Sequence, residues 1–188
     1  MPQMHIPSEF LFWDKARHHE RHKKLFGGYI PYKLPQTKDM HVGKWLSDVN
    51  TEFFDEGNRN ATVYNDFIST ELLPLVQRML MEVEFLYRFK KVVVRHIWYN
   101  HYEAGGHHEP HSHIGFGLAG VYFLQLDEPN TLRFHSPTAA ISKLVNDTVS
   151  AEFLTEGDIV LFPSHMLHYV QPAQKPRTTI SFNLDLQM

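Results

Sequence analysis

The second half of this chain contains a series of short β-forming runs, and this series restricts the possible fold more than any other feature of the sequence. Segments rich in valine, isoleucine and aromatic residues predict strands at 92–99, 120–126, 148–154, 158–162, 169–171 and 178–186. Turn-forming sequences, such as Glu128-Pro129-Asn130 and Glu156-Gly157-Asp158, lie between them. Many short strands at such spacings are typical of a β-sandwich or barrel.

The first half of the chain predicts helices instead. Apolar residues recur with a period of about 3.6 over 37–54 and again over 70–88, which indicates two amphipathic helices. Pro74 fits the second helix only near its first turn, so we expect the N-cap at Ser69 or Thr70. We predict an α+β chain with a mainly β core, in which N-terminal helices pack on one sheet.

A short strand around 10–13 and a polar helix ending near Gly27 are expected at the N-terminus. His18 and His22 lie one helical turn apart in this helix, and two histidines at that spacing can bind a metal. No carboxylate pattern accompanies them in the sequence, so we interpret them as part of a solvated face.

The composition fits one packed domain. A chain of 188 residues with 43% hydrophobic residues can bury a full core. We therefore expect a single domain over 1–188, with 1–90 as an N-terminal arm and supporting helices and 91–188 as the barrel core. A net charge of −3 gives no basic footprint for nucleic acid. The longest apolar runs are far shorter than a membrane span and no signal pattern is present, so we expect a cytoplasmic protein with no membrane partner.

The sequence also predicts a metal site. Residues i and i+2 of a strand project from one face, so His111 and His113 would direct two imidazoles to one point. His168, 55 residues after His113 and just beyond a predicted strand, is a candidate third ligand. With no cysteine in the chain, a transition metal must use histidine, aspartate or glutamate. A lone His-x-His also occurs by chance among 14 histidines.

Arg177 adds a second feature to this half of the chain. It lies nine residues after His168, at the start of a predicted strand that ends Phe182-Asn183. A barrel interior has little structural use for an arginine, because a buried guanidinium must be paired. An anionic ligand would supply the pair.

These features together resemble the iron(II)- and 2-oxoglutarate-dependent oxygenases, and more narrowly the small, prolyl-hydroxylase-like family of bacterial and phage type. The resemblance covers roughly residues 91–186, and the order and spacing of its motifs carry it more than any one motif does. The matching segments are Trp98-Tyr99-Asn100, Pro110-His111-Ser112-His113, Gly120-Val121-Tyr122-Phe123-Leu124, residues 156–164, residues 168–172 and residues 177–183.

The resemblance implies a fold, a ligand set and a cofactor pocket. The fold is a double-stranded β-helix, a jelly-roll or cupin-like barrel with the metal near one open end. The iron ligands are His111, His113 and His168. The residues implied in binding 2-oxoglutarate are Arg177, which would pair with its distal carboxylate, Thr179, and, in or near the pocket, Tyr99, Asn100, Tyr102 and Asn183.

One departure separates the chain from the wider superfamily. The usual pattern is His-x-Asp or His-x-Glu with a distal histidine, whereas position 113 is a histidine. Three neutral imidazoles leave the site one unit more positive than a set with a carboxylate, and they favour Zn²⁺, Ni²⁺ or Cu²⁺ over Fe²⁺. Glu103 and Glu109 could supply a carboxylate, but we interpret the ligand set as the three histidines.

The activity implied by the resemblance is that of a hydroxylase-type oxidoreductase, a dioxygenase with Fe(II) as cofactor and 2-oxoglutarate and O₂ as co-substrates. It would hydroxylate an amino acid, a peptidyl side chain or a small metabolite, and the loops 101–110 and 136–147 and the N-terminal arm would select the substrate. Two alternatives stay open. One is a cupin-like metalloenzyme that does not use 2-oxoglutarate, and the other is a non-enzymatic metal-binding barrel.

Overall fold

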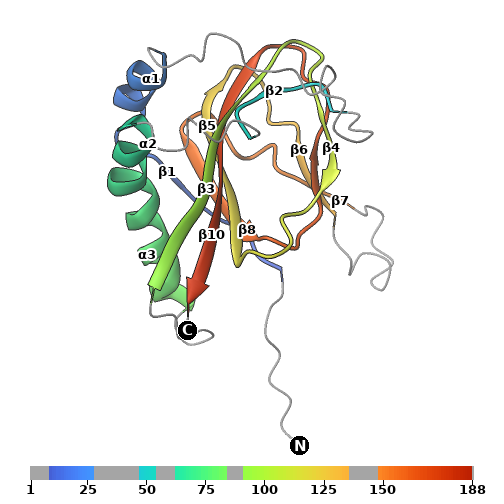
Figure 1. The fold of residues 1–188 in the computed structure, drawn as a ribbon. Coiled ribbons are helices and arrows are strands. Elements are labelled where there is room, and N and C mark those ends of the chain that lie inside the picture. The colour runs from blue at the N-terminus through green and yellow to red at the C-terminus, as the bar shows by residue number, and fades with distance from the viewer. Residues whose placement is uncertain (1–8, 28–46, 54–61, 84–90, 136–147, 188) are drawn as a thin grey trace, which may run out of the picture.

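In a computed structural model, the described part of the chain comprises residues 9–27, 47–53, 62–83, 91–135 and 148–187. It is mostly β, with antiparallel strands throughout and a helical layer (Figure 1). The helical elements are α1 (His19–Gly27), α2 (Thr62–Phe67), a π-helical turn η2 (Ile68–Leu72) and α3 (Leu73–Val83). The strands are β1 (Phe12–Lys15), β2 (Asn50–Thr51), β3 (Lys91–Tyr102), β4 (His108–His111), β5 (Leu118–Leu126), β6 (Leu132–His135), β7 (Thr148–Ser150), β8 (Asp158–Pro163), β9 (His168–Val170) and β10 (Arg177–Gln187).

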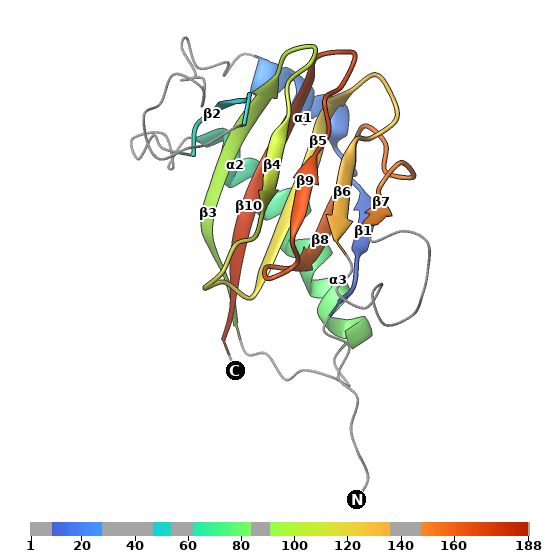
Figure 2. The same ribbon diagram turned by 90° about the vertical axis from the view of Figure 1, so that its right-hand side faces the viewer.

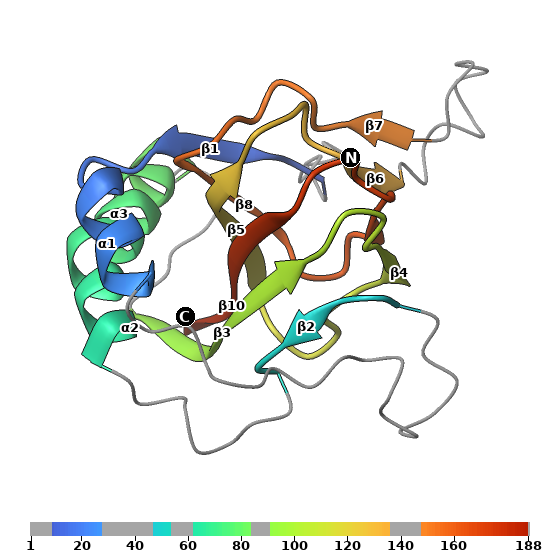
Figure 3. The same cartoon turned by 90° about the horizontal axis from the view of Figure 1, so that it is seen from above.

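The strands form two sheets. A six-stranded sheet has the order β1-β8-β5-β10-β3-β2, and a four-stranded sheet has the order β4-β9-β6-β7. Figure 2 shows the smaller sheet in front, with the larger sheet and then the helices behind it. Seen from above, the helices lie along one side of the large sheet only (Figure 3). The molecule therefore has three layers: helices, large sheet and small sheet.

Two apolar clusters hold the layers together. The first packs the helices on the large sheet and includes Phe67, Leu72 and Met79 from the helices, with Tyr122 and Phe182 from the strands. The second lies between the sheets and is built from side chains of both, with Phe123 and Val160 from the large sheet and Leu132 and Phe134 from the small one. Alternating residues of β5 and β8 point to opposite clusters, as the two-residue period of a strand requires.

The predicted helix over 70–88 is helical at all of its described residues, 70–83, but its start is wrong. The helical run begins earlier, at Thr62, so an N-cap at Ser69 or Thr70 is wrong. Pro74 lies inside the run, directly after the π-helical turn, which takes up one extra residue where proline removes a backbone donor. Residues 84–88 of this prediction lie outside the described residues.

The predicted helix over 37–54 is wrong where it can be compared. Asp48 forms an isolated antiparallel bridge with His107, and Asn50–Thr51 is the edge strand β2, paired with β3. Val49, which contributed to the apolar stripe, is buried in this extended segment. Residues 37–46 of the prediction lie outside the described residues.

The N-terminal strand and helix occur as β1 and α1, close to their predicted positions. The interpretation of His22 as solvated is wrong, because its side chain is fully buried. Its carboxylate partners, Asp66 and Glu71, come from α2 and η2 and could not be seen in the local sequence. Among the described residues, no helix is both long and apolar enough to cross a membrane.

Candidate metal centre and adjoining pocket

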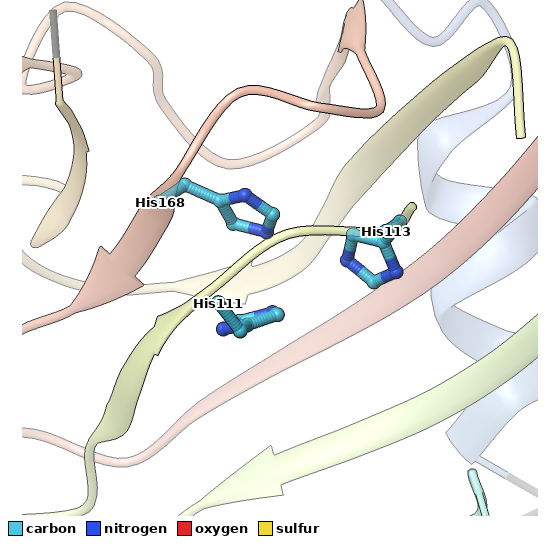
Figure 4. Close-up of side chains that lie close together, drawn as sticks. All are labelled: His111, His113 and His168. Carbon is cyan, nitrogen blue, oxygen red and sulfur yellow. The ribbon is translucent and has the colours of Figure 1, made fainter. Parts of the chain in front are cut away.

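Three histidines converge between the two sheets. His111 ends β4, His168 begins β9, and the two face each other in the antiparallel register of these strands. His113 follows His111 by two residues. Their potential ligand atoms all lie within 4.8 Å of one another, and the three rings surround one space (Figure 4). An ion in this space would have three ligands and open positions on its other side.

Backbone hydrogen bonds orient two of these rings. The Nδ1 atom of His111 lies 2.8 Å from the carbonyl oxygen of Glu109, and that of His168 lies 2.9 Å from the carbonyl oxygen of Met166. An Nδ1–H that donates to a carbonyl leaves Nε2 as the atom with a free lone pair, which is the usual way in which a ligand imidazole is oriented. The backbone N–H of His113 donates to Ser164 O at 2.8 Å, which fixes the chain between the two elements.

The imidazoles are also held neutral. Burial lowers the pKa of His113 to about 4, with the neighbouring His111 and His96 adding to the effect. Burial lowers the pKa of His111, and that of His168 lies well below its usual range for the same reason. Neutral imidazole is the form that binds a metal, so the three donors are ready at neutral pH without loss of a proton.

Arg177 lies in the same pocket, almost fully buried with 2% of its surface exposed. One of its nitrogens, Nη1, donates to the hydroxyl of Thr131, and the guanidinium carbon stands 4.3 Å from the centre of the Tyr102 ring. Its Nε and Nη2 are buried and have no hydrogen-bond partner among the described residues. Burial lowers the pKa of this guanidinium, but its ordinary value is so high that the group is charged. A buried cation with two unused donors fits a bound carboxylate.

Two strands supply the wall on which Arg177 lies. Residues Arg177, Thr179 and Ser181 of β10 stand opposite Tyr102, Asn100 and Trp98 of β3, and all six line the pocket. Asn100 donates to the Ser181 hydroxyl at 2.9 Å. The pocket therefore has a cationic end at Arg177 and an aromatic end at Trp98.

The structure separates two of the predicted pocket residues from this wall. Tyr99 packs into the cluster under the helices, because successive residues of a strand point to opposite faces. Asn183 is buried on β10, but it is not among the described residues that line the pocket. Asn100, Tyr102 and Thr179 do line it.

A comparison with protein families shows which proteins this part of the chain resembles. Residues 96–183 match the model of a family described as "Putative 2OG-Fe(II) oxygenase". This match covers slightly less than half of the chain and makes residues 96–183 similar to the 2OG-Fe(II) oxygenases. The resemblance found in the sequence is thereby confirmed, and the cofactors of the family are Fe(II), 2-oxoglutarate and O₂. All three histidines and Arg177 lie within the matched residues.

Solved structures share the fold at low identity. A prolyl-4-hydroxylase from Pseudomonas putida is similar with a TM-score of 0.62 at 13% identity, over 95% of this chain and 93% of that chain. A prolyl hydroxylase from Trichoplax adhaerens, in complex with a peptide fragment of hypoxia inducible factor, has a TM-score of 0.58 at 13% identity, over 93% of this chain and 83% of that chain. A viral collagen prolyl hydroxylase from Paramecium bursaria Chlorella virus-1 gives 0.56 at 10%, over 97% of each chain. The comparison with curated proteins gives no match.

The residues present fit the cofactors of the 2OG-Fe(II) oxygenase family. Three neutral nitrogen donors can hold Fe(II), although imidazole also suits zinc and copper. The unused donors of Arg177 suit one carboxylate of 2-oxoglutarate, and the hydroxyl groups of Thr179 and Tyr102 lie on the same wall.

Sequence reasoning missed several pocket residues. Trp98 could have been found, since it alternates with Asn100 and Tyr102 on one strand face. His108 was expected in the loop 101–110 that would select the substrate, whereas it begins β4 and its ring stacks on His111 with centroids 4.0 Å apart. Thr131 is not among the residues that line the pocket, but its hydroxyl accepts the hydrogen bond of Arg177, and nothing in the local sequence indicated this contact.

Proposed function

We propose that this protein is an Fe(II)- and 2-oxoglutarate-dependent oxygenase that hydroxylates an amino acid, a peptidyl side chain or a small metabolite. One observation carries the proposal: a buried arginine with two unused donors lies in the same pocket as three converging, neutral imidazoles. A site that only held a metal would have no need of the buried guanidinium, which is costly unless an anion pairs with it.

In this proposal His111, His113 and His168 hold the iron, and Arg177 binds the distal carboxylate of 2-oxoglutarate, with Thr179 and Tyr102 beside it. When bound, these cofactors and O₂ supply the oxidative decarboxylation of 2-oxoglutarate to succinate and CO₂, coupled to hydroxylation of the substrate. The chain orients the imidazoles through carbonyl hydrogen bonds and keeps the guanidinium away from bulk water.

The arrangement of the strands supports a double-stranded β-helix over the barrel half of the chain. Two antiparallel sheets face each other across an apolar cluster, and the metal centre lies at the edge where β4 meets β9. We further propose that residues 1–188 act as one domain, because the helices bury their apolar face on the large sheet and would expose it alone.

The solved relatives support a peptidyl substrate as one candidate. All three are named prolyl hydroxylases, and one is in complex with a peptide fragment. At 10–13% identity, these relatives show the fold of this chain and do not identify its substrate.

The proposal is tested by anaerobic titration of the metal-free protein with Fe(II) and then 2-oxoglutarate. A 2-oxo acid chelated to Fe(II) gives a weak visible charge-transfer band. We expect this band in the wild type and its loss at matched concentrations in Arg177→Ala, because a charge-assisted bidentate contact contributes roughly 1.5–3 kcal/mol, or about 10- to 150-fold in affinity.

The matched control is Arg95→Ala, which removes an exposed arginine of β3 whose partner is Asp185. This variant should keep the band. If the wild type binds metal without forming a band, the protein is a metalloprotein that does not use 2-oxoglutarate. If it binds no metal at all, the three histidines do not form a metal centre.

A further inference from the structure

The pocket wall on β10 is longer than 2-oxoglutarate. Arg177 and Ser181 are four residues apart on β10, which corresponds to roughly 13 Å along an antiparallel strand. The five-carbon chain of 2-oxoglutarate measures about 6 Å between its ends at standard bond lengths. With one carboxylate at Arg177, the molecule leaves the end of the pocket at Ser181 and Trp98 free for another occupant.

An aromatic corner forms this free end. Trp98 is 7% exposed, and the ring of Phe53 meets it at a centroid distance of 5.1 Å and an angle of 68°. On its other side, the Trp98 ring lies 5.8 Å from the ring of His113. Both aromatic side chains line the pocket. A group resting on Trp98 would therefore lie next to a metal ligand, where a reacting C–H bond must be.

Phe53 reaches the pocket from outside the residues that match the family. It belongs to the segment 47–53, which is bonded to the barrel at several points along its length. Asp48 and His107 exchange two backbone hydrogen bonds of 3.0 and 3.1 Å, and Glu52 N donates to Tyr99 O at 3.0 Å. The Glu52 carboxylate accepts from the backbone N–H of Tyr99 and from the Tyr64 hydroxyl of α2. The segment thus holds Phe53 in place against β3.

In the part of the chain that the structure describes, the free end has no charged side chain that could pair with a charged substrate. Among the described residues that line the pocket there is no aspartate, glutamate or lysine, and the one permanent charge is Arg177 at the opposite end. The hydroxyls of Thr51, Ser112 and Ser181 line the same pocket, and Ser181 stands opposite Trp98 in the pairing of β10 with β3. The Thr51 hydroxyl already accepts a hydrogen bond from Phe53 N at 3.1 Å. A charged group placed here would lose its hydration without a counter-ion.

We propose that Trp98 and Phe53 form the subsite for the reacting part of the substrate, and that this part is an uncharged aliphatic group, either branched or a saturated ring. Aromatic faces at a wide angle give such a group two apolar surfaces to contact. The inference rests on the proposed function, since it places the group beside a metal held by His113. Because Phe53 belongs to the segment 47–53, this segment would help to determine which substrate binds.

The test uses ring probes and a metal substitution, so that it needs no turnover and no identified substrate. Cyclopentanecarboxamide is added to the full chain loaded with either Mn(II) or Zn(II), in the presence of 2-oxoglutarate, and the proton relaxation rates of the probe are measured. Paramagnetic Mn(II) accelerates relaxation only of protons that bind close to it. We expect faster relaxation in the Mn(II) protein than in the Zn(II) protein.

The variants Trp98→Ala and Phe53→Ala should each weaken probe binding about tenfold, because each removes one aromatic contact surface. Trp13→Ala is the matched control, since Trp13 is 49% exposed on β1; it should leave the relaxation unchanged. Cyclopentylamine, which is a cation at neutral pH, should show little effect, because the described lining residues offer it no counter-ion.

The inference is overturned if both aromatic variants relax the probe as the wild type does, if cyclopentylamine binds equally well, or if the carboxamide shows no acceleration. A separate titration of 2-oxoglutarate distinguishes the two proposals. Binding of 2-oxoglutarate without a probe effect rejects the subsite alone, whereas a probe effect without 2-oxoglutarate binding rejects the proposed function and leaves the subsite standing.

Discussion

Gly120 shows how closely single residues are fitted behind the pocket. It pairs with Phe182 across β5 and β10. A Cβ atom built at this position would lie 2.4 Å from the Phe182 ring and 2.5 Å from the backbone oxygen of Val160. The ring therefore occupies the space that any side chain at position 120 would need, and a backbone atom closes the other side.

We expect Gly120→Ala to destabilise the protein by about 1–3 kcal/mol, the usual cost of overpacking, or more because the backbone of β8 must move. Gly27→Ala is the matched control, since nothing lies within 4 Å of its Cβ position, and it should change stability by no more than about 0.5 kcal/mol. Chemical denaturation measures both. Equal stability of the two variants would show that β5 and β8 can separate at no cost.

Single residues were predictable where the chemistry was local. The structure brings His111 and His113 together with His168, as predicted, although β4 ends at His111 and His113 follows the strand instead of lying in it. The wall residues Asn100 and Tyr102 could not be separated from Tyr99 before the strand faces were known. Phe53 could not be found at all, because its apolar spacing fitted a helix while its backbone is fixed by contacts with β3 and α2.

Between elements, the contact of α1 with α2 and η2 depends on buried polar groups. The Glu71 carboxylate accepts the backbone N–H groups of Arg17 and His18, both at 2.8 Å, and so caps the start of α1. His22 lies fully buried behind it, with Nε2 3.2 Å from Asp66 and Nδ1 4.0 Å from Glu71. Its ring also meets Phe67 and Tyr122 edge to face.

This contact should make stability depend on pH. Burial lowers the pKa of His22, although Glu71 and Asp66 oppose the effect and Arg21 adds to it. The unfolded chain then binds a proton more readily than the folded chain does. The contribution of His22 to stability is complete above the unfolded value of about 6.5 and falls as the pH drops below it.

The variant His22→Phe keeps a ring against Phe67 and Tyr122 but cannot titrate. We expect its free energy of unfolding to fall less steeply than that of the wild type between pH 7 and pH 5, whatever its absolute stability. Denaturant unfolding at several pH values measures the slope, and His101→Phe serves as the control for loss of one histidine. Parallel slopes for His22→Phe and the wild type would contradict this account.

Elements were predicted well where pattern and length agreed. The long strands β3, β5, β8 and β10 occur close to their predicted positions, because β-branched runs between turns form strands in most contexts. The edge strand β2 and the start of the helical run at Thr62 were missed, since β2 has two residues and the helix passes through a proline. The order of strands in the sheets could not be read from the pattern, because pairing is decided between distant segments.

For the whole molecule, the site joins parts that are distant in the chain. The three histidines of the proposed metal centre lie on β4, on β9 and just after β4, and the arginine lies on β10 of the other sheet. A ligand that binds both sheets is bound by the folded state alone, and it should therefore raise the melting temperature.

At a concentration of 100 times its Kd, a ligand adds about 2.7 kcal/mol, which is roughly 5–10 °C for a chain of this size. We expect Zn(II) or Mn(II) to produce such a shift in the wild type and not in His168→Ala, and 2-oxoglutarate to add a further shift that Arg177→Ala loses while keeping the metal shift. Thermal unfolding with each ligand in turn measures this. A metal shift that persists in His168→Ala would place the metal elsewhere.

The position of β10 has a consequence for how the chain is made. β10 pairs with β3 on one side and β5 on the other, yet it follows both in the sequence. During synthesis, β3 and β5 leave the ribosome with the edges that will face β10 unpaired, and they stay so until residues 177–187 emerge. The large sheet therefore cannot be completed by pairing strands in the order of the sequence. It is complete only after β10 has paired between β3 and β5. Contacts between residues so far apart in the sequence form slowly. Until they form, the unpaired edges of β3 and β5 are the surfaces at which a nascent chain could pair with another chain.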